Sequence, residues 1–225
     1  YEVTIVSAMI LGWASFGHKG VIFPLLVRAI GVLSSIVGTY LVRTSEEARA
    51  AMKAIHLGYA VSAIVSIIGF CLVGFYYLRF PTTELLPAWI SLGVPGLDMR
   101  PVWTTLIGIA LAISINYLTD YFTAPEKPSV QFVARATQTG HATTIINGIA
   151  IGYESSVWSI LLIALALFGS FLIYQGTNPT YIAYGVAMCG IGMLTLTGNN
   201  ISMDVFGPVA DNANGIGEMA HLDKK

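Results

Sequence analysis

Long apolar runs separated by short polar segments dominate the chain. Six runs follow one another, over residues 3–16, 21–42, 54–78, 103–121, 157–174 and 180–220. In hydrocarbon every backbone amide must be paired within its own segment, and the runs lack the two-residue alternation of a barrel strand. Since a membrane-spanning helix needs roughly 20 apolar residues, the pattern predicts an all-α integral membrane protein. We expect about six transmembrane helices in a single region over residues 1–225.

The composition agrees with a membrane location. Hydrophobic residues make up 55% of the chain and charged residues 10%, and the mean hydropathy is +0.73, whereas soluble domains carry about 25% charged residues. The net charge of −1 provides no basic field for nucleic acid. Cys71 and Cys189 lie inside apolar runs, where buried, inert thiols are expected. We therefore expect the lipid bilayer as a partner and no nucleic acid.

The two ends of the sequence indicate a piece of a longer protein. The chain starts at Tyr1, inside an apolar pattern, without the basic segment and cleavage site of a signal peptide. It stops at Lys225, directly after a patterned polar segment. We therefore expect an internal fragment.

The basic residues between the runs indicate an orientation. If the C-terminal end is cytoplasmic, three basic residues fall on the opposite side, namely Lys19, Arg79 and Arg100. Seven then fall on the cytoplasmic side, namely Arg43, Arg49, Lys53, Lys127, Arg135, Lys224 and Lys225. Because cytoplasmic loops carry an excess of Lys and Arg, this distribution favours a cytoplasmic C-terminal end.

The last run carries a polar face. Its polar and small residues recur at alternating spacings of three and four, at Thr197, Asn200, Asp204, Gly207, Asp211, Asn214 and Glu218. On a helix these positions share one side. Two interpretations remain open: an amphipathic helix that leaves the membrane with its carboxylates in water, or a functional face. The face contains no Lys or Arg, and its oxygen-bearing side chains suit a hard cation.

Two further carboxylates leave alternatives open. Glu2 lies near the start of an apolar helix and is either an ion-pathway carboxylate or a residue at a water-filled helix end. Asp120 lies at a helix end, where an interfacial cap or a surface charge is the simpler role.

The polar face also carries a motif. Residues 204–220 read DVFGPVADNANGIGEMA, which resembles the signature D-x-[YF]-G-P-[IV]-[SA]-D-N-A-x-G-I-x-E-M-A of the membrane-integral, ion-pumping pyrophosphatases. Supporting resemblances lie at residues 140–152, 119–123, 23–29 and 1–6, so the likeness covers the whole chain in family order. His141 and Thr144 replace the commoner Pro and Asn, and Asp120 replaces a commoner Glu. These departures are mild.

The resemblance implies a fold and an activity for the whole protein. Such proteins are bundles of about 16 transmembrane helices in two rings, and this piece resembles the sixth to the eleventh. The first and last spans would belong to the inner ring, and the four between them to the outer ring. The family hydrolyses pyrophosphate with Mg²⁺ and exports H⁺ or Na⁺. A homodimer in a prokaryotic inner membrane is implied; the pumped ion and a need for K⁺ stay open.

The resemblance also implies roles for individual residues. Asp211 would be a catalytic ligand of the Mg²⁺ bound to pyrophosphate. Asn212, its neighbour in the signature, would take part in binding this cofactor. Asp204 would act in catalysis and in the ion pathway, at the coupling region. Glu2 would belong to the ion pathway, although the sequence leaves open whether it is the gate glutamate. Glu218 would be peripheral, and we expect this fragment to be inactive by itself.

Two alternatives to the pump stay open from the sequence. A non-enzymatic cation transporter or channel bundle would also place carboxylates and broken helices within the membrane. A pseudoenzyme fragment retained as a scaffold would carry the same motif without the activity.

Overall fold

A computed structural model describes residues 2–42, 48–82 and 86–221, without the side chains of residues 48–53 and 203. The positive charges at Arg43, Lys224 and Lys225 therefore lie outside the described residues. So do the side chains of Arg49 and Lys53. The predicted orientation depends on these residues and stays a prediction.

The described chain is helical, and no strand occurs within these ranges apart from an isolated antiparallel bridge between Arg79 and Leu97. The prediction of an all-α protein is confirmed. The elements are α1 (Glu2–Phe16), α2 (His18–Leu41), α3 (Ala48–Tyr77), α4 (Ala88–Ser91), α5 (Arg100–Thr123), α6 (Pro128–Ala136), the 3₁₀ turn η1 (Thr137–Thr139), α7 (His141–Ile173), α8 (Pro179–Leu194) and α9 (Thr197–Met219).

Five helical segments within the described part of the chain are long and apolar enough to cross a membrane. They are His18–Leu41, Ala54–Tyr77, Arg100–Thr139, His141–Ile173 and Pro179–Met219, while Glu2–Phe16 is apolar but shorter. The chain is therefore part of an integral membrane protein. That residues 1–225 form one transmembrane region stays a prediction.

The helices differ from the apolar runs at three places. Helix α7 begins at His141 rather than near residue 157, because a helix continues through the polar residues that interrupt its apolar pattern. The segment after α5 contains α6, which starts with Pro128 in its first turn, where a missing N–H costs little. The last run is divided: α8 ends at Leu194 and α9 begins at Thr197.

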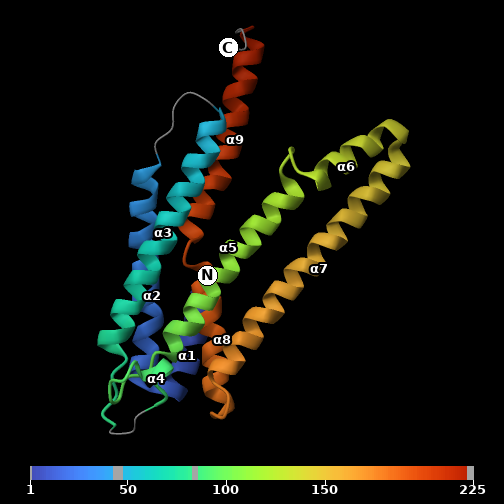
Figure 1. Ribbon diagram of the computed structural model, residues 1–225. Coiled ribbons are helices and arrows are strands. Elements are labelled where there is room, and N and C mark those ends of the chain that lie inside the picture. Colours follow the sequence, from blue (N-terminus) through green and yellow to red (C-terminus); the bar gives the residue numbers. More distant parts are fainter. Residues whose placement is uncertain (1, 43–47, 83–85, 222–225) are drawn as a thin grey trace. The chain divides into compact units, whose positions relative to one another are not determined.

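The chain divides into two compact units, which we describe separately. Unit A comprises Tyr1–Leu25 and Val73–Leu194, and unit B comprises Leu26–Leu72 and Thr195–Lys225. Helices α2 and α3 contribute to both units. In unit A, α5 packs against α7 and α8, and α1 packs against α8. Helix α6 lies in the connection between α5 and α7 (Figure 1).

Glycines set the helix spacing in unit A. A Cβ atom on Gly192 would overlap the main-chain oxygen of Thr105, and one on Gly108 would overlap that of Cys189. The backbones of α5 and α8 therefore approach closely, as small residues allow between helices in a membrane. Gly17 makes the turn between α1 and α2 with φ of 59°, a conformation that glycine adopts without steric cost.

Small residues likewise bring the helices of unit B together. A Cβ atom on Gly38 would overlap the Ser62 hydroxyl, and one on Gly31 would lie 3.0 Å from the Cγ2 of Thr195. Buried side chains in this unit include four serines and one asparagine, namely Ser34, Ser35, Ser62, Ser66 and Asn199. The interior of unit B thus combines these small polar side chains with buried apolar ones such as Phe70 and Val27.

Candidate functional site

The acidic face of α9 is intact in the structure. Asp204 and Asp211 lie two turns apart on one continuous helix that includes Pro208, a spacing of about 10 Å along the axis at ~1.5 Å per residue. Both side chains are exposed, as is Asn212. Neither aspartate makes an ion pair with a residue in the described ranges. This unit therefore presents the two carboxylates on its surface.

The remaining polar residues of the face are also accessible. Asn214 donates a hydrogen bond of 3.3 Å from Nδ2 to Oε1 of Glu218, one turn later on the same helix. A Cβ atom on Gly207, Gly215 or Gly217 would meet no atom within 4 Å. Backbone and side chains along this part of α9 are therefore open to a partner.

The oxygen-bearing side chains of the acidic face are of the type that binds Mg²⁺, but they are too few to form a complete site. Carboxylate and amide oxygens are the ligands that this hard cation prefers, usually together with waters and substrate phosphates. Within the described part of the chain, however, no three His, Cys, Asp or Glu side chains are grouped so that they could hold a metal ion. Asp211 and Asn212 thus supply only part of a magnesium site.

Glu2 lies in the first turn of α1, in unit A, and its side chain is exposed. The buried residues of α1 are Ala8, Gly12 and Ser15. No observation in unit A assigns Glu2 to an ion pathway, so that role stays a prediction.

Asp120 makes an ion pair of 3.5 Å with Lys127, and both side chains are partly exposed. This contact fits the simpler role expected for Asp120, a surface charge at the end of a helix, and partly exposed pairs of this kind contribute little to stability.

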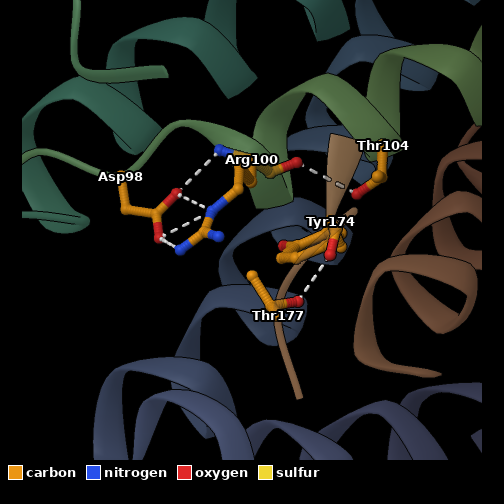
Figure 2. A network of polar contacts seen from close by, with 5 residues as sticks. All are labelled: Asp98, Arg100, Thr104, Tyr174 and Thr177. Carbon is orange, nitrogen blue, oxygen red and sulfur yellow. Dashed lines mark hydrogen bonds and ion pairs between the residues drawn. The ribbon is translucent and has the colours of Figure 1, made fainter. Parts of the chain in front are cut away.

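A polar cluster that the sequence did not indicate lies at the start of α5. Asp98 is buried and accepts three hydrogen bonds from the Arg100 guanidinium, at 2.5, 2.9 and 3.1 Å, and one from the Arg100 amide. Figure 2 shows this pair together with the buried Tyr174, whose carbonyl accepts a hydrogen bond of 2.6 Å from Thr177. The cluster ties the end of α7 to the beginning of α5.

A model of the family described as inorganic H⁺ pyrophosphatase matches residues 1–225. The chain belongs to this family. The motif at residues 204–220, which first indicated the resemblance, thus identified the family correctly.

Curated relatives of this pyrophosphatase-family chain carry names of pumps. It is 44% identical over 241 residues to a K⁺-insensitive pyrophosphate-energized proton pump of Chloroflexus aurantiacus, and 40% identical over 224 residues to one of Streptomyces coelicolor. It is 33% identical over 224 residues to a putative K⁺-stimulated pyrophosphate-energized sodium pump of Clostridium tetani. These alignments cover 100%, 98% and 99% of the chain.

The chain is a fragment on the scale of its family. It spans 30%, 28% and 30% of the lengths of these three relatives. The expectation of an internal fragment is therefore confirmed as far as length is concerned.

Sequence reasoning overlooked the buried polar residues of the pyrophosphatase chain. Asn199, next to Asn200 of the acidic face, is 8% exposed, but two adjacent asparagines give no sign of which one faces a neighbour. For Asp98 and Arg100, the opposite charges two positions apart just before Pro101 are a signal that could have been followed.

Proposed function

We propose that the full-length protein is a primary ion pump that couples hydrolysis of Mg²⁺-pyrophosphate to export of H⁺ or Na⁺. One observation carries the proposal: the family motif lies on one continuous helix, α9, with the carboxylates of Asp204 and Asp211 exposed and in no ion pair with a described residue. The names of the curated relatives, proton pumps and a putative sodium pump, support it.

The acidic face is suited to a site shared with helices outside this chain. Pyrophosphate is highly anionic, and bound Mg²⁺ would supply the charge neutralisation that its hydrolysis needs. We propose that Asp211 holds this magnesium, that Asn212 lies beside it, and that helices beyond these 225 residues provide the missing ligands. The role of the protein is then mainly orientation and electrostatic stabilisation.

Asp204 and Glu2 are proposed for the ion pathway. Asp204 lies two turns before Asp211 on the same helix, and this spacing supports a role between the hydrolytic site and the pathway. Glu2 is proposed as a pathway carboxylate on α1. Carboxylates that continue an apolar membrane run are typical of such relays.

The remaining parts of the proposal concern the whole protein. We propose a homodimer in a prokaryotic inner membrane, with the end of α9 on the cytoplasmic side. The relatives include pumps named as K⁺-insensitive and as K⁺-stimulated, and hydrolysis measured with and without K⁺ distinguishes the two types.

The test uses the full-length protein in membrane vesicles, with and without Na⁺ and K⁺. We expect Mg²⁺-dependent pyrophosphate hydrolysis together with ion uptake. Asp211→Ala should lower hydrolysis to background, whereas Glu218→Ala, a matched carboxylate on the same helix, should retain most of it. Unchanged turnover in Asp211→Ala would remove the site assignment. Ion flux without hydrolysis in the unmodified protein would favour the non-enzymatic cation transporter.

A further inference from the structure

Asn199 differs from the rest of α9. Of the α9 residues whose side chains are described, which excludes Met203, it alone is buried, with 8% of its surface exposed. It lies near the start of the helix, before both aspartates of the acidic face. The other described side chains of α9 are exposed or half-buried. Within unit B, the attachment of this helix is therefore concentrated at its first turn.

The buried Asn199 side chain is held by a chain of hydrogen bonds. Its Nδ2 donates to the hydroxyl of Ser62 on α3 over 2.8 Å, and that hydroxyl donates to the carbonyl of Ser34 on α2 over 3.0 Å. The hydroxyls of Ser34 and Ser66 lie 2.6 Å apart. One asparagine on α9 is thus connected to both neighbouring helices of the unit.

A second contact fixes the same turn. A Cβ atom on Gly198 would lie 3.1 Å from the Cβ of Ser35 and 3.2 Å from its hydroxyl. The first turn of α9 is therefore in close contact with α2 on one side and hydrogen-bonded to α3 on the other.

The geometry of a helix connects this attachment to the acidic face. At about 100° per residue, Asp204 lies about 140° and Asp211 about 120° around the axis from Asn199. An Asn199 side chain that faces Ser62 consequently turns both carboxylates away from α2 and α3. Their exposure in unit B agrees with this rotation.

We propose that Asn199 is a positioning residue that sets the rotation of α9 through Ser62, and thereby aims Asp204 and Asp211. Apolar contacts between lipid-facing helices slide and rotate easily, whereas a buried polar pair has one favourable register. The Oδ1 of Asn199 is buried and has no hydrogen-bond partner among the described residues. Burying such an unsatisfied group costs free energy. A role in setting the helix register therefore explains the buried Asn199 better than a gain in stability does.

The first experiment measures register without any assumption about activity. In a full-length protein lacking other cysteines, Gly198→Cys and Ser35→Cys are combined and oxidised with copper phenanthroline. Their Cβ separation of 3.1 Å is close to the roughly 3.5–4.5 Å of a disulfide, so we expect rapid cross-linking. Adding Asn199→Ala should slow it about tenfold. Adding Ser202→Ala should not, because Ser202 is exposed and its hydroxyl donates to the Gly198 carbonyl of the same helix. An unchanged rate with Asn199→Ala overturns the proposal.

The second experiment measures the consequence and rests on the proposed function. In the full-length protein, Asn199→Ala and Ser62→Ala should each raise the KM for Mg²⁺-pyrophosphate by about threefold to tenfold, the factor that a membrane hydrogen bond of about 0.6–1.4 kcal/mol corresponds to. The double variant should resemble the single ones, since both remove the same link. Ser202→Ala is again the control.

The outcomes of the two experiments separate the two proposals. If the unmodified protein does not hydrolyse pyrophosphate, the proposed function fails, and the cross-linking rate alone decides the role of Asn199. If hydrolysis occurs and both variants lower only kcat together with the melting temperature, their role is merely structural and the positioning proposal is wrong.

Discussion

Arg100 Nη2 lies 2.5 Å from Oδ2 of Asp98, and the two side chains are 12% and 5% exposed. The guanidinium carbon is also 5.2 Å from the ring centre of Tyr174 and 5.9 Å from that of Tyr181. This buried ion pair, flanked by two aromatic rings, thus joins the loop before α5 to the end of α7 and the first turn of α8. Arginine suits this position because its planar group pairs with a carboxylate and stacks on rings at once.

Removal of one partner of this pair should destabilise the full-length protein. Arg100→Ala leaves the Asp98 carboxylate buried without compensation, which costs about 3–5 kcal/mol. The melting temperature in detergent measures the loss. Asp120→Ala is the control, because its pair with Lys127 is partly exposed and such pairs contribute about 0–1 kcal/mol. Equal effects of the two variants would contradict the buried character of the Asp98–Arg100 pair.

Tyr174→Phe should retain or raise stability. The Tyr174 hydroxyl is buried without a hydrogen-bond partner among the described residues, and an unsatisfied hydroxyl costs about 1–3 kcal/mol. The ring, which packs on Gly185, is kept. Tyr174→Ala removes both ring and hydroxyl and should cost about 3–5 kcal/mol. Thermal unfolding of the two variants tests this, and a clear loss with phenylalanine would indicate an unseen partner.

The same tyrosine predicts a dependence on alkaline pH. Burial, and next the carboxylate of Asp98, raise the pKa of Tyr174 well above its ordinary value of 10.0. Above about pH 10 an unfolded tyrosine loses its proton while the folded one keeps it, so the unfolded state is favoured as pH rises further. The melting temperature of the natural protein should fall in this range more steeply than that of Tyr174→Phe. Parallel pH profiles would show that Tyr174 does not titrate differently in the two states.

Gly192→Ala should disturb the packing of α5 on α8. The added methyl group would overlap the main-chain oxygen of Thr105, and backbone cannot yield as a flexible side chain can, so a loss of about 1–3 kcal/mol is expected. Gly152→Ala on α7 is the matched control, because a Cβ atom there meets nothing within 4 Å and alanine favours a helix by about 1 kcal/mol. The melting temperatures of both variants decide whether stability depends on the close approach of α5 and α8 or on glycine as such.

Glu2→Gln tests the proposed ion pathway in the full-length protein. The side chain is exposed in the first turn of α1, so the exchange should leave the fold unaffected while removing the ionisable group. We expect ion uptake in vesicles to fall about tenfold or more relative to hydrolysis, since a relay carboxylate binds the transported cation. The ratio of uptake to hydrolysis is the decisive quantity. A ratio equal to that of the natural protein would exclude Glu2 from the pathway.

Much of the fold and the acidic face followed from the sequence alone. Apolar runs long enough to cross a bilayer must be helical, since no other local structure pairs its own amides there, and the helices of the structure confirm this fold class. The spacing of Asp204 and Asp211 places them on one side of any continuous helix. The motif they belong to was specific enough to indicate the family, because it combines acidic, glycine and proline positions in a fixed order.

The partners of the buried polar residues were decided only by the tertiary structure. From the sequence, Asn200 belongs to the acidic face and Asn199 has no evident role; the structure buries Asn199 against Ser62 and leaves Asn200 half-buried. In the same way Tyr174 joins Asp98 and Arg100 only through folding. Periodicity fixes which residues share a side of one helix, whereas the neighbour that this side meets depends on contacts between segments distant in the chain, and a local pattern carries no information about them.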